Sequence, residues 1–323
     1  MLQGPPQVRG VLPVNKMKQN LRGVLPGLAV GDALGATLEF QRADEIALAF
    51  PEGFREIVGG GVFHWGVGDP TDDTELALVL ARSLARRKRL DLDDVAAGMV
   101  EWFRAGPRDV GGTCAAAISL LARGYPPAIS GRTVWQQSNR PAEHRPAGNG
   151  SLMYSAPLAL HHAFSTTEQR RHDATRLSHL THYDPRCQAA LRVYLRVIPL
   201  LAEGSPKALD IPLQSLAKSE PGTAAILEQY RRTPPESLDV DGPGIGFVLT
   251  TLGLALSAVQ HATSFEDGLV RVVMRGGDAD TNGAVAGALL GARFGRASIP
   301  SRWLKVTRAV SEADALSRQI LGL

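Results

Sequence analysis

Two turns of the sequence place carboxylates and hydroxyls close together, just before a stretch that favours a helix. One turn carries Thr71, Asp72 and Asp73, and the other carries Asp278, Asp280 and Thr281. Oxygen ligands on a flexible turn are what a hard divalent cation such as Mg²⁺ or Mn²⁺ takes in proteins. If the two turns meet in the fold, their carboxylates and hydroxyls suffice for a two-metal site in which waters complete each shell.

Helix capping is the alternative explanation for either turn taken alone. Acidic residues in the first turn of a helix interact favourably with the helix dipole, and Asp side chains form local turns with backbone amides. Residues 91–94 hold acids that we interpret in this way. The two turns differ from them because acids gathered at several helix starts repel one another unless a cation joins them.

A third turn contains no acid and also precedes a helix-forming stretch. It consists of Gly148, Asn149, Gly150 and Ser151. Backbone amides at a helix start flanked by glycine favour an anion such as a phosphate. Further along the chain, His182 lies beside Asp184. The histidine either faces a ligand and is oriented by the carboxylate, or caps a helix, and the sequence leaves both interpretations open.

Helices must position these turns. Apolar residues at helical spacing predict helices over residues 21–40, after residue 74, and over 91–105, 112–123, 151–163, 167–181, 186–201, 204–232 (two or three short ones), 245–262, 265–275, 280–294 and from 301 onward. Pro- and Gly-rich stretches predict loops at 41–70, 125–150 and 234–246. We find no alternating strand pattern and no internal repeat. The sequence therefore predicts a single all-α domain.

The first predicted helix carries a glycine at every fourth position, at residues 23, 27, 31 and 35. Each glycine inside a helix costs about 1 kcal/mol relative to alanine. Small residues repeated on one helix face imply a packing reason for that cost. We therefore expect a second helix to pack unusually close to this face.

Composition narrows the class of protein. The chain has 323 residues, 44% of them hydrophobic, and a formal net charge of +3, so nothing favours nucleic acid as a partner. No stretch has the length of apolar sequence that a membrane helix needs, and the N-terminus lacks the apolar core of a secretion signal. We expect a cytoplasmic monomer whose two cysteines, Cys114 and Cys187, are buried free thiols. In this interpretation residues 1–20 form a flexible leader, and 21–323 form the domain.

Five motifs occur in a defined order along the chain. They lie at residues 31–40, 71–74, 148–153, 181–185 and 276–282. Together they resemble the ADP-ribosylglycohydrolase family, over nearly the whole predicted domain. The resemblance implies an all-α, single-domain orthogonal helical bundle that holds two divalent cations, Mg²⁺ or Mn²⁺.

The resemblance also implies roles for individual residues. The metal ligands it implies are Thr71, Asp72, Asp73, Asp278, Asp280 and Thr281. The residues it implies for catalysis are Glu39 and Asp73, with the choice between general acid and general base left open. The residues it implies for contact with the substrate are Glu39, Gly148, Asn149, Gly150, Ser151, Met153 and His182.

The activity implied is hydrolysis of the glycosidic bond between ADP-ribose and a modified protein side chain, with arginine as the expected linkage. The partner would be an ADP-ribosylated protein, and ADP-ribose would be the product ligand. Two positions depart from many family members, because Pro70 and Tyr154 stand where those proteins carry Trp and Arg. Two alternatives stay open. The chain could bind ADP-ribose without cleaving it, as a crystallin-like structural relative would. It could also hydrolyse a serine-, nucleotide- or nucleic-acid-linked adduct.

Overall fold

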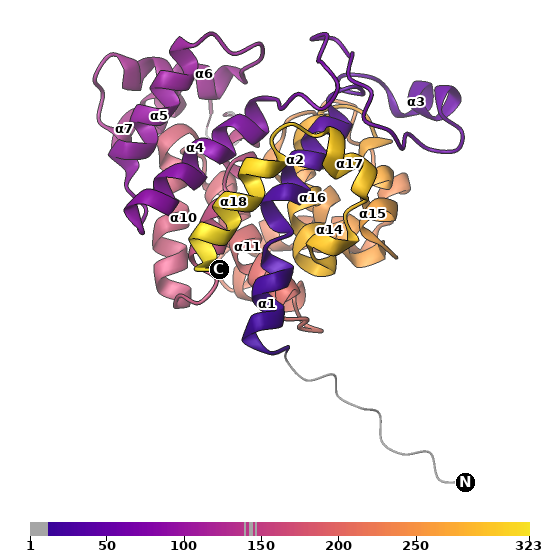
Figure 1. The fold of residues 1–323 in the computed structure, drawn as a ribbon. Helices are drawn as coiled ribbons and strands as arrows, with labels where there is room; N and C mark the ends of the chain where they lie inside the picture. Colours follow the sequence, from indigo (N-terminus) through magenta and orange to yellow (C-terminus); the bar gives the residue numbers. More distant parts are fainter. Residues whose placement is uncertain (1–11, 139, 142–144, 146) are drawn as a thin grey trace.

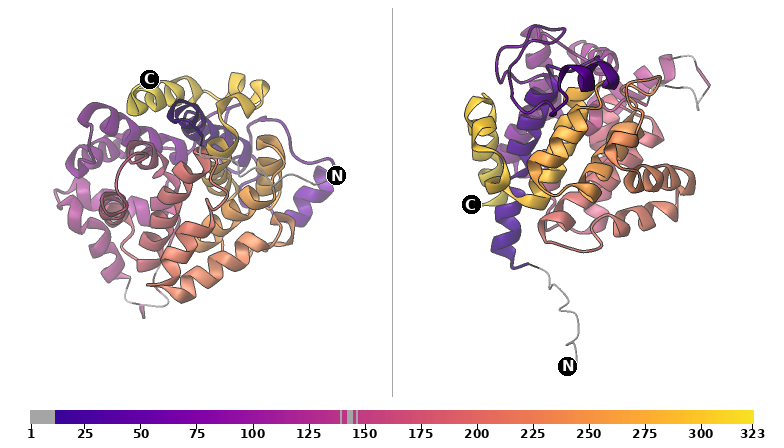
Figure 2. Two further views of the ribbon diagram at one scale, coloured as in Figure 1. Left: turned by 90° about the horizontal axis from the view of Figure 1, so that it is seen from below. Right: turned by 90° about the vertical axis from the view of Figure 1, so that its right-hand side faces the viewer.

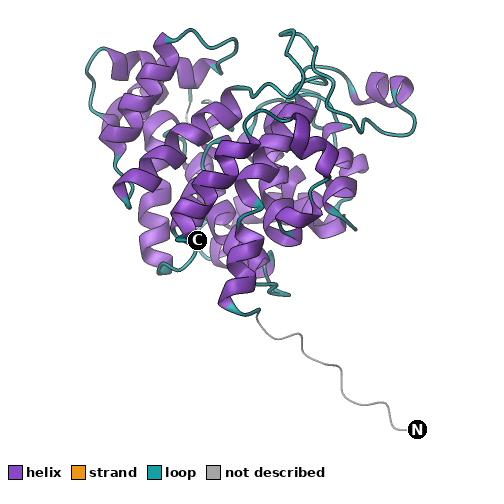
Figure 3. Ribbon diagram, viewed as in Figure 1, coloured by secondary structure: helices purple, strands orange, loops and turns teal. Residues whose placement is uncertain are grey.

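All regular structure in the described part of the chain is helical, as Figure 3 shows. The structure is a computed structural model, and it describes residues 12–138, 140, 141, 145 and 147–323. Within those residues the only extended pairings are isolated bridges, such as the one between Gly148 and Phe247. The prediction of an all-α fold is therefore confirmed.

The helices follow one another along the chain, and residues 50–71 form a long connection between the third and fourth of them. The first part contains α1 (Val14–Leu21), α2 (Val24–Gly35), α3 (Ala43–Ala49), α4 (Asp72–Arg87), α5 (Leu92–Arg104), α6 (Gly112–Ala122) and α7 (Pro127–Gln137). The middle contains α8 (Gly150–Met153), α9 (Ala156–His161), α10 (Thr167–Thr181), α11 (Pro185–Ala202), α12 (Asp210–Ala217), α13 (Pro221–Arg232) and the short 3₁₀ helix η2 (Pro235–Ser237). The last part contains α14 (Val248–His261), α15 (Phe265–Val273), α16 (Ala279–Phe294), η3 (Arg296–Ser298), α17 (Ser301–Val306) and α18 (Val310–Leu321).

Helices α2 and α16 pack against each other at the centre of the molecule, although they are far apart in the sequence (Figure 1). Every residue of α2 is buried, which is expected of a helix that is apolar on all sides. Helices α4, α9, α15 and α18 pack around it. Figure 2 shows the C-terminal α18, in yellow, alongside the indigo N-terminal helices.

The contact between α2 and α16 is made by glycine against glycine. A Cβ atom added to Gly31 would lie 2.0 Å from the carbonyl oxygen of Gly283, and one added to Gly27 would lie 2.3 Å from that of Gly287. Carbon and oxygen atoms that are not bonded do not approach so closely, so no larger residue fits without moving a backbone. The expectation that a second helix packs close to the glycine face is confirmed.

The N-terminal leader is shorter than predicted. Helix α1 begins at Val14, and its residues Met17 and Asn20 are buried, so the prediction of a flexible segment is wrong for residues 14–20. The helix packs on α11 and α16, and the side chain of Asn20 donates a hydrogen bond to the carbonyl oxygen of Ala202. Burial of its apolar face thus outweighs its Gln-, Asn- and Lys-rich composition. The rest of the predicted leader, residues 1–11, lies outside the described residues.

Three other boundaries differ from the prediction. The first long helix is divided at Gly23 and ends at Gly35 rather than at residue 40. The predicted loops at 41–70 and 125–150 contain α3 and α7. Helix α7 starts at Pro127, and proline is well suited to the first position of a helix, where its missing N–H would have no partner. Proline was therefore a start signal there and not a sign of a loop.

The two cysteines are buried and free, as predicted. In the part of the chain that the structure describes, we find no helix with both the length and the apolar character needed to cross a membrane.

Gly31→Ala should destabilise the protein strongly. The new methyl group would overlap the backbone of Gly283, and we expect the free energy of unfolding to fall by roughly 3 kcal/mol or more. Urea unfolding measures this change. Gly222→Ala in α13 is the matched control, because an added Cβ meets nothing within 4 Å there. Equal effects of the two substitutions would show that the α2–α16 contact is not the cause.

Candidate metal centre

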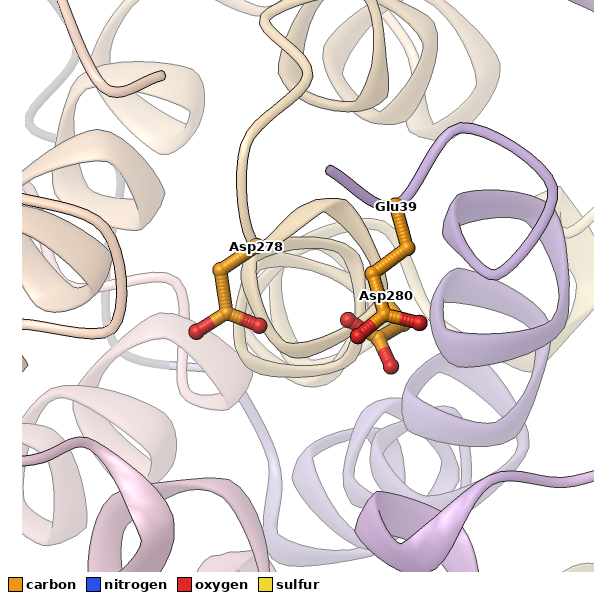
Figure 4. A group of neighbouring side chains, drawn as sticks. All are labelled: Glu39, Asp278 and Asp280. Atoms are coloured by element: carbon orange, nitrogen blue, oxygen red, sulfur yellow. The ribbon is translucent and has the colours of Figure 1, made fainter. Parts of the chain in front are cut away.

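The structure brings the two acidic turns together at the starts of α4 and α16. Carboxylate oxygens of Asp72, Asp73 and Asp280 lie within 4.8 Å of one another, and so do those of Glu39, Asp278 and Asp280. Asp280 belongs to both groups. In Figure 4 the side chains of Glu39 and Asp280 point into the same space, with Asp278 on the other side of it.

The start of α4 is fixed in place by a carboxylate that sequence reasoning did not assign to the site. Asp32, in the middle of α2, accepts hydrogen bonds from the backbone amides of Thr71 (3.1 Å) and Thr74 (3.2 Å). Thr71 caps the helix, because its hydroxyl accepts a bond from the amide of Asp73. Asp32 therefore ties the first acidic turn to the central helix. An acid in a fully buried, otherwise apolar helix was the signal that could have revealed it.

The start of α16 is fixed by the glycines that precede it. Gly276 and Gly277 both have φ of 63°, the left-handed region that glycine adopts without strain. In this conformation Gly277 accepts a hydrogen bond from the amide of Phe40 and donates one to the carbonyl of Gln41. This pairing places Glu39 next to Asp280. Thr281 then joins the two helices, because its hydroxyl donates to Asp73 at 3.1 Å.

The turn at residues 148–151 contacts the acids through one side chain. The amide nitrogen of Asn149 donates to Asp278 (2.7 Å) and to Thr251 (2.8 Å). Ser151 is buried, with its hydroxyl 3.4 Å from that of Ser178, and Met153 is buried in the core. Asn149 thus holds one member of the acidic group in place, while Ser151 and Met153 pack inward.

His182 lies beneath this turn. A Cβ atom added to Gly150 would lie 2.7 Å from the Cε1 atom of the ring, so the turn rests directly on the imidazole. The Nδ1 atom is 2.9 Å from the hydroxyl of Thr181, and burial lowers the pKa of His182 to about 4. The neighbouring Asp184 caps α11 and pairs with Arg186. The partner of the imidazole is therefore Thr181, and the histidine is neutral.

Burial raises the pKa values of Glu39, Asp72, Asp73 and Asp280. The pKa of Glu39 rises to about 9 because of burial and the nearby charge of Asp109. Those of Asp72, Asp73 and Asp280 rise well above their ordinary value, again chiefly through burial. Each carboxylate opposes ionisation of the next.

The donor set fits a divalent cation. None of the acids in the two groups forms an ion pair with a basic side chain among the described residues. One carboxylate oxygen of Glu39 and one of Asp73 are buried without a hydrogen-bond partner in the described part of the chain. Buried charges are stable only when they are paired or coordinate a metal, and oxygen atoms are the ligands that Mg²⁺ prefers.

A further acid, Asp109, also lies near the site. It is on the connection between α5 and α6, and its charge raises the pKa values of Glu39 and Asp72. The amide of Gly111, two residues on, donates to Asp72 at 3.3 Å. Sequence reasoning missed Asp109, since a single acid in a loop carries no distinguishing pattern.

Comparison with known proteins identifies the family of the chain. The profile of the family described as ADP-ribosylglycohydrolase matches residues 13–323. The chain belongs to the ADP-ribosylglycohydrolase family. The resemblance that the five motifs carry is confirmed, and with it the class of reaction, hydrolysis of an ADP-ribosyl glycosidic bond.

Several relatives in the family have assigned activities. An ADP-ribosyl-[dinitrogen reductase] glycohydrolase of Rhodospirillum rubrum is 33% identical, covering 91% of this chain and 94% of that protein. An ADP-ribosylarginine hydrolase of Serratia proteamaculans is 28% identical, covering 91% and 76%. ADP-ribosylhydrolase ARH3 of Danio rerio is 27% identical, covering 98% and 93%. A solved structure described as an ADP-ribosylglycohydrolase-related protein complex superposes with a TM-score of 0.78, at 31% identity, over 96% and 99% of the two chains.

One of the two departures from many ADP-ribosylglycohydrolases is explained by the structure. Tyr154 is fully buried, and its hydroxyl lies 2.7 Å from that of Thr181, the residue that also contacts His182. Tyr154 therefore points toward α10 and supports the histidine from within. Pro70 is partly buried just before the cap of α4, and nothing in the structure explains this departure.

Without divalent cations, this ADP-ribosylglycohydrolase should lose stability as the pH rises. The pKa of Glu39 is raised from 4.5 to about 9, so its favourable contribution to folding is complete below pH 4.5 and is lost as the pH rises toward 9. In cation-free buffer, Glu39→Gln should be more stable than the wild type at pH 8, by at least about 1.4 kcal/mol, the free energy of one pKa unit. The gap should shrink at pH 5.

Urea unfolding at the two pH values measures this gap. The exposed Glu168, in the first turn of α10, provides the control substitution Glu168→Gln, which should leave the pH dependence unchanged. A stability difference for Glu39→Gln that is the same at both pH values would contradict the burial of an ionisable Glu39.

Proposed function

We propose that the protein hydrolyses the N-glycosidic bond between ADP-ribose and an arginine side chain of a modified protein, and that it uses two divalent cations, Mg²⁺ or Mn²⁺. The observation that carries the proposal is the position of Asp280, which belongs to two groups of three carboxylates. One carboxylate shared between two oxygen-rich groups is an arrangement that can hold a pair of metal ions.

Each cation would have its own set of ligands. Asp72, Asp73 and Asp280 would hold one, with the hydroxyls of Thr71 and Thr281 at its edge. Glu39, Asp278 and Asp280 would hold the other or border it. The two unpartnered carboxylate oxygens of Glu39 and Asp73 would then gain the positive charge that the protein itself does not provide.

The reaction passes through a transition state in which the ribose carbon carries positive charge. Bound divalent cations supply Lewis-acid chemistry there, because they orient sugar hydroxyls and make a water molecule more acidic. The protein must supply the proton transfers, and guanidine leaves readily only when it is protonated.

Glu39 is the better placed of the two candidate acids for proton transfer. Its pKa of about 9 belongs to the cation-free site, and a cation bound beside the carboxylate would lower this pKa. Its neighbour Phe40 is 55% exposed, so this end of the site is close to the surface where a protein substrate arrives. Asp73 lies deeper, and its carboxylate already accepts a hydrogen bond from the hydroxyl of Thr281. This fixed position suits a metal ligand.

The turn at residues 148–151 would receive the ribose and phosphates of the substrate. Asn149 faces the acids through Asp278, so the turn borders the reaction centre. Within the described chain, the backbone amides of Gly150 and Ser151 have no acceptor, and free amides at a helix start favour a phosphate. The burial of His182 suits a supporting role beneath this turn, and its direct contact with ribose stays a prediction.

Arginine is the linkage that we favour. Among the relatives described above, the protein of Serratia proteamaculans is an ADP-ribosylarginine hydrolase, and that of Rhodospirillum rubrum acts on dinitrogen reductase. The chain described here is also similar to ADP-ribosylhydrolase ARH3 of Danio rerio, at 27% identity. Hydrolysis of another adduct is therefore the second candidate. The cytoplasmic location and the monomeric state stay predictions.

Removal of divalent cations should abolish release of ADP-ribose from an ADP-ribosylarginine protein, and Mg²⁺ or Mn²⁺ should restore it. Asp280→Asn should lower the rate by at least about a hundredfold, because several kcal/mol of transition-state stabilisation would be lost from both cation sites. The variant should still fold, since its carboxylate serves the cations rather than the core. Asp93→Asn, an exposed position on α5, is the matched control. Full activity in a chelator would rule out the metal-dependent mechanism.

A panel of substrates should separate the two candidate reactions. We expect ADP-ribose release from arginine-linked protein to be faster than release from serine-linked protein or from a base-linked nucleic acid. Chromatography of free ADP-ribose measures all three in the same units. Preference for the serine linkage would favour the second candidate. Calorimetric binding of ADP-ribose without any release from the three substrates would instead indicate a protein that only binds this ligand.

A further inference from the structure

A cavity of about 220 Å³ lies between α10, α11 and α12, at the end of α10 away from the candidate metal centre. The charged side chains that line it are all basic: Arg170, Arg171, Arg192, Arg196 and Lys218. A single carboxylate approaches them, because Glu220 pairs with Arg192. Among the described residues, no acid pairs with Arg171, Arg196 or Lys218. The cavity therefore carries a large excess of positive charge.

Arg170 shows that this charge extends into the protein. The side chain is only 3% exposed. One of its terminal nitrogens, Nη2, donates to the carbonyl oxygens of His162 and Ser165, both at 2.9 Å. The Nε and Nη1 atoms are buried and have no hydrogen-bond partner among the residues that the structure describes. Burial and the charge of Arg196 lower the pKa of Arg170 to about 10, so the group remains a cation near neutral pH.

A buried cation with unused donors is costly unless an anion accompanies it. Arginine has five N–H donors in a planar fork that matches the oxygens of a phosphate. Thr167, Ser215 and Ser219 line the same cavity, and the hydroxyl of Ser219 donates to the carbonyl oxygen of Leu216. Thr167 is also the first residue of α10, a 15-residue helix, whose N-terminal end favours negative charge.

We propose that this cavity is a binding site for a phosphate-bearing small molecule, with the phosphate or pyrophosphate group held by Arg170 and Arg196. The volume of about 220 Å³ is below the roughly 300–1,000 Å³ that is typical of pockets for drug-sized ligands. The cavity therefore suits a phosphate or pyrophosphate group, and a nucleoside attached to that group would extend into solvent.

This site is separate from the candidate metal centre. Helix α10 has 15 residues and so extends about 22 Å along its axis. The cavity is at its first turns, whereas the turn that contacts Asp278 lies near its other end. The proposal therefore does not depend on the proposed hydrolase activity, and a direct binding measurement tests it.

Isothermal titration calorimetry on the full-length protein tests the proposal, after dialysis to remove divalent cations and at constant ionic strength. The probes are inorganic phosphate, pyrophosphate and AMP. Without cations the carboxylates of the metal centre repel these anions, and the Arg196→Gln variant distinguishes binding in the basic cavity from binding at the turn of residues 148–151. We expect one pyrophosphate per chain. If AMP binds more tightly than inorganic phosphate, the natural ligand is a nucleotide. If the two bind equally, the site recognises the phosphate group alone.

Arg196→Gln should weaken pyrophosphate binding by at least about tenfold, because one charge-assisted contact is lost. Arg171→Gln should also weaken pyrophosphate binding. Arg171 is exposed and, unlike Arg170, has no buried contacts that the substitution would remove. Arg318→Gln on α18 removes the same charge at an exposed position outside the cavity and should bind as the wild type does. Absence of pyrophosphate binding by the wild type, or unchanged binding by Arg196→Gln, would overturn the proposal.

Discussion

The backbone contact between α2 and α16 is the constraint on which the rest of the structure depends. Glycine faces glycine along this contact, and at its far end a Cβ atom added to Gly35 would lie 2.1 Å from the carbonyl oxygen of Ala279. Ala279 is the residue before Asp280. The close packing therefore continues up to the acids and sets the position of Asp280 relative to the segment that follows α2 and carries Glu39. A wider helix–helix spacing would separate the carboxylates that must act together.

The same packing makes the site electrostatically unfavourable for the protein alone. Burial removes water from the carboxylates, and each raises the pKa of its neighbours, as Glu39 does for Asp280. The protein offsets part of this cost through hydrogen bonds, since Asp32 accepts two amides from the start of α4. It leaves other oxygens without a partner. The oxygens without a protein partner are free to bind a cation, while hydrogen bonds such as those from Thr281 to Asp73 and from Asn149 to Asp278 orient the carboxylates.

Much of this arrangement could be predicted from the sequence, because its signals are local. The four-residue glycine spacing predicts the close helix contact, and acids at the starts of two helices predict a shared cation. The position of Asp109 near the site and the hydrogen bonds from the start of α4 to Asp32 could not be predicted. Both depend on which loops and helices meet in space. The start of α1 was missed because its sequence is polar and its burial depends on α11 and α16. His182 was recognised as unusual, but its partner, Thr181, depends on the direction of its side chain.

Buried charge of one sign occurs at two places in the molecule, and the two cannot neutralise each other. The acids gather where α2, α4 and α16 meet, whereas Arg170, near the start of α10, and Arg196, on α11, line the basic cavity. Helix α10 separates the basic cavity from the turn beside Asp278 by about 22 Å, which is more than twice the screening length in physiological salt. Each cluster therefore needs a counter-charge from outside the chain. The physical rule that supports divalent cations at the acids also supports an anion at the arginines, and the chemistry of each cluster selects its ligand: carboxylate oxygens suit a hard cation, and guanidinium groups suit a phosphate.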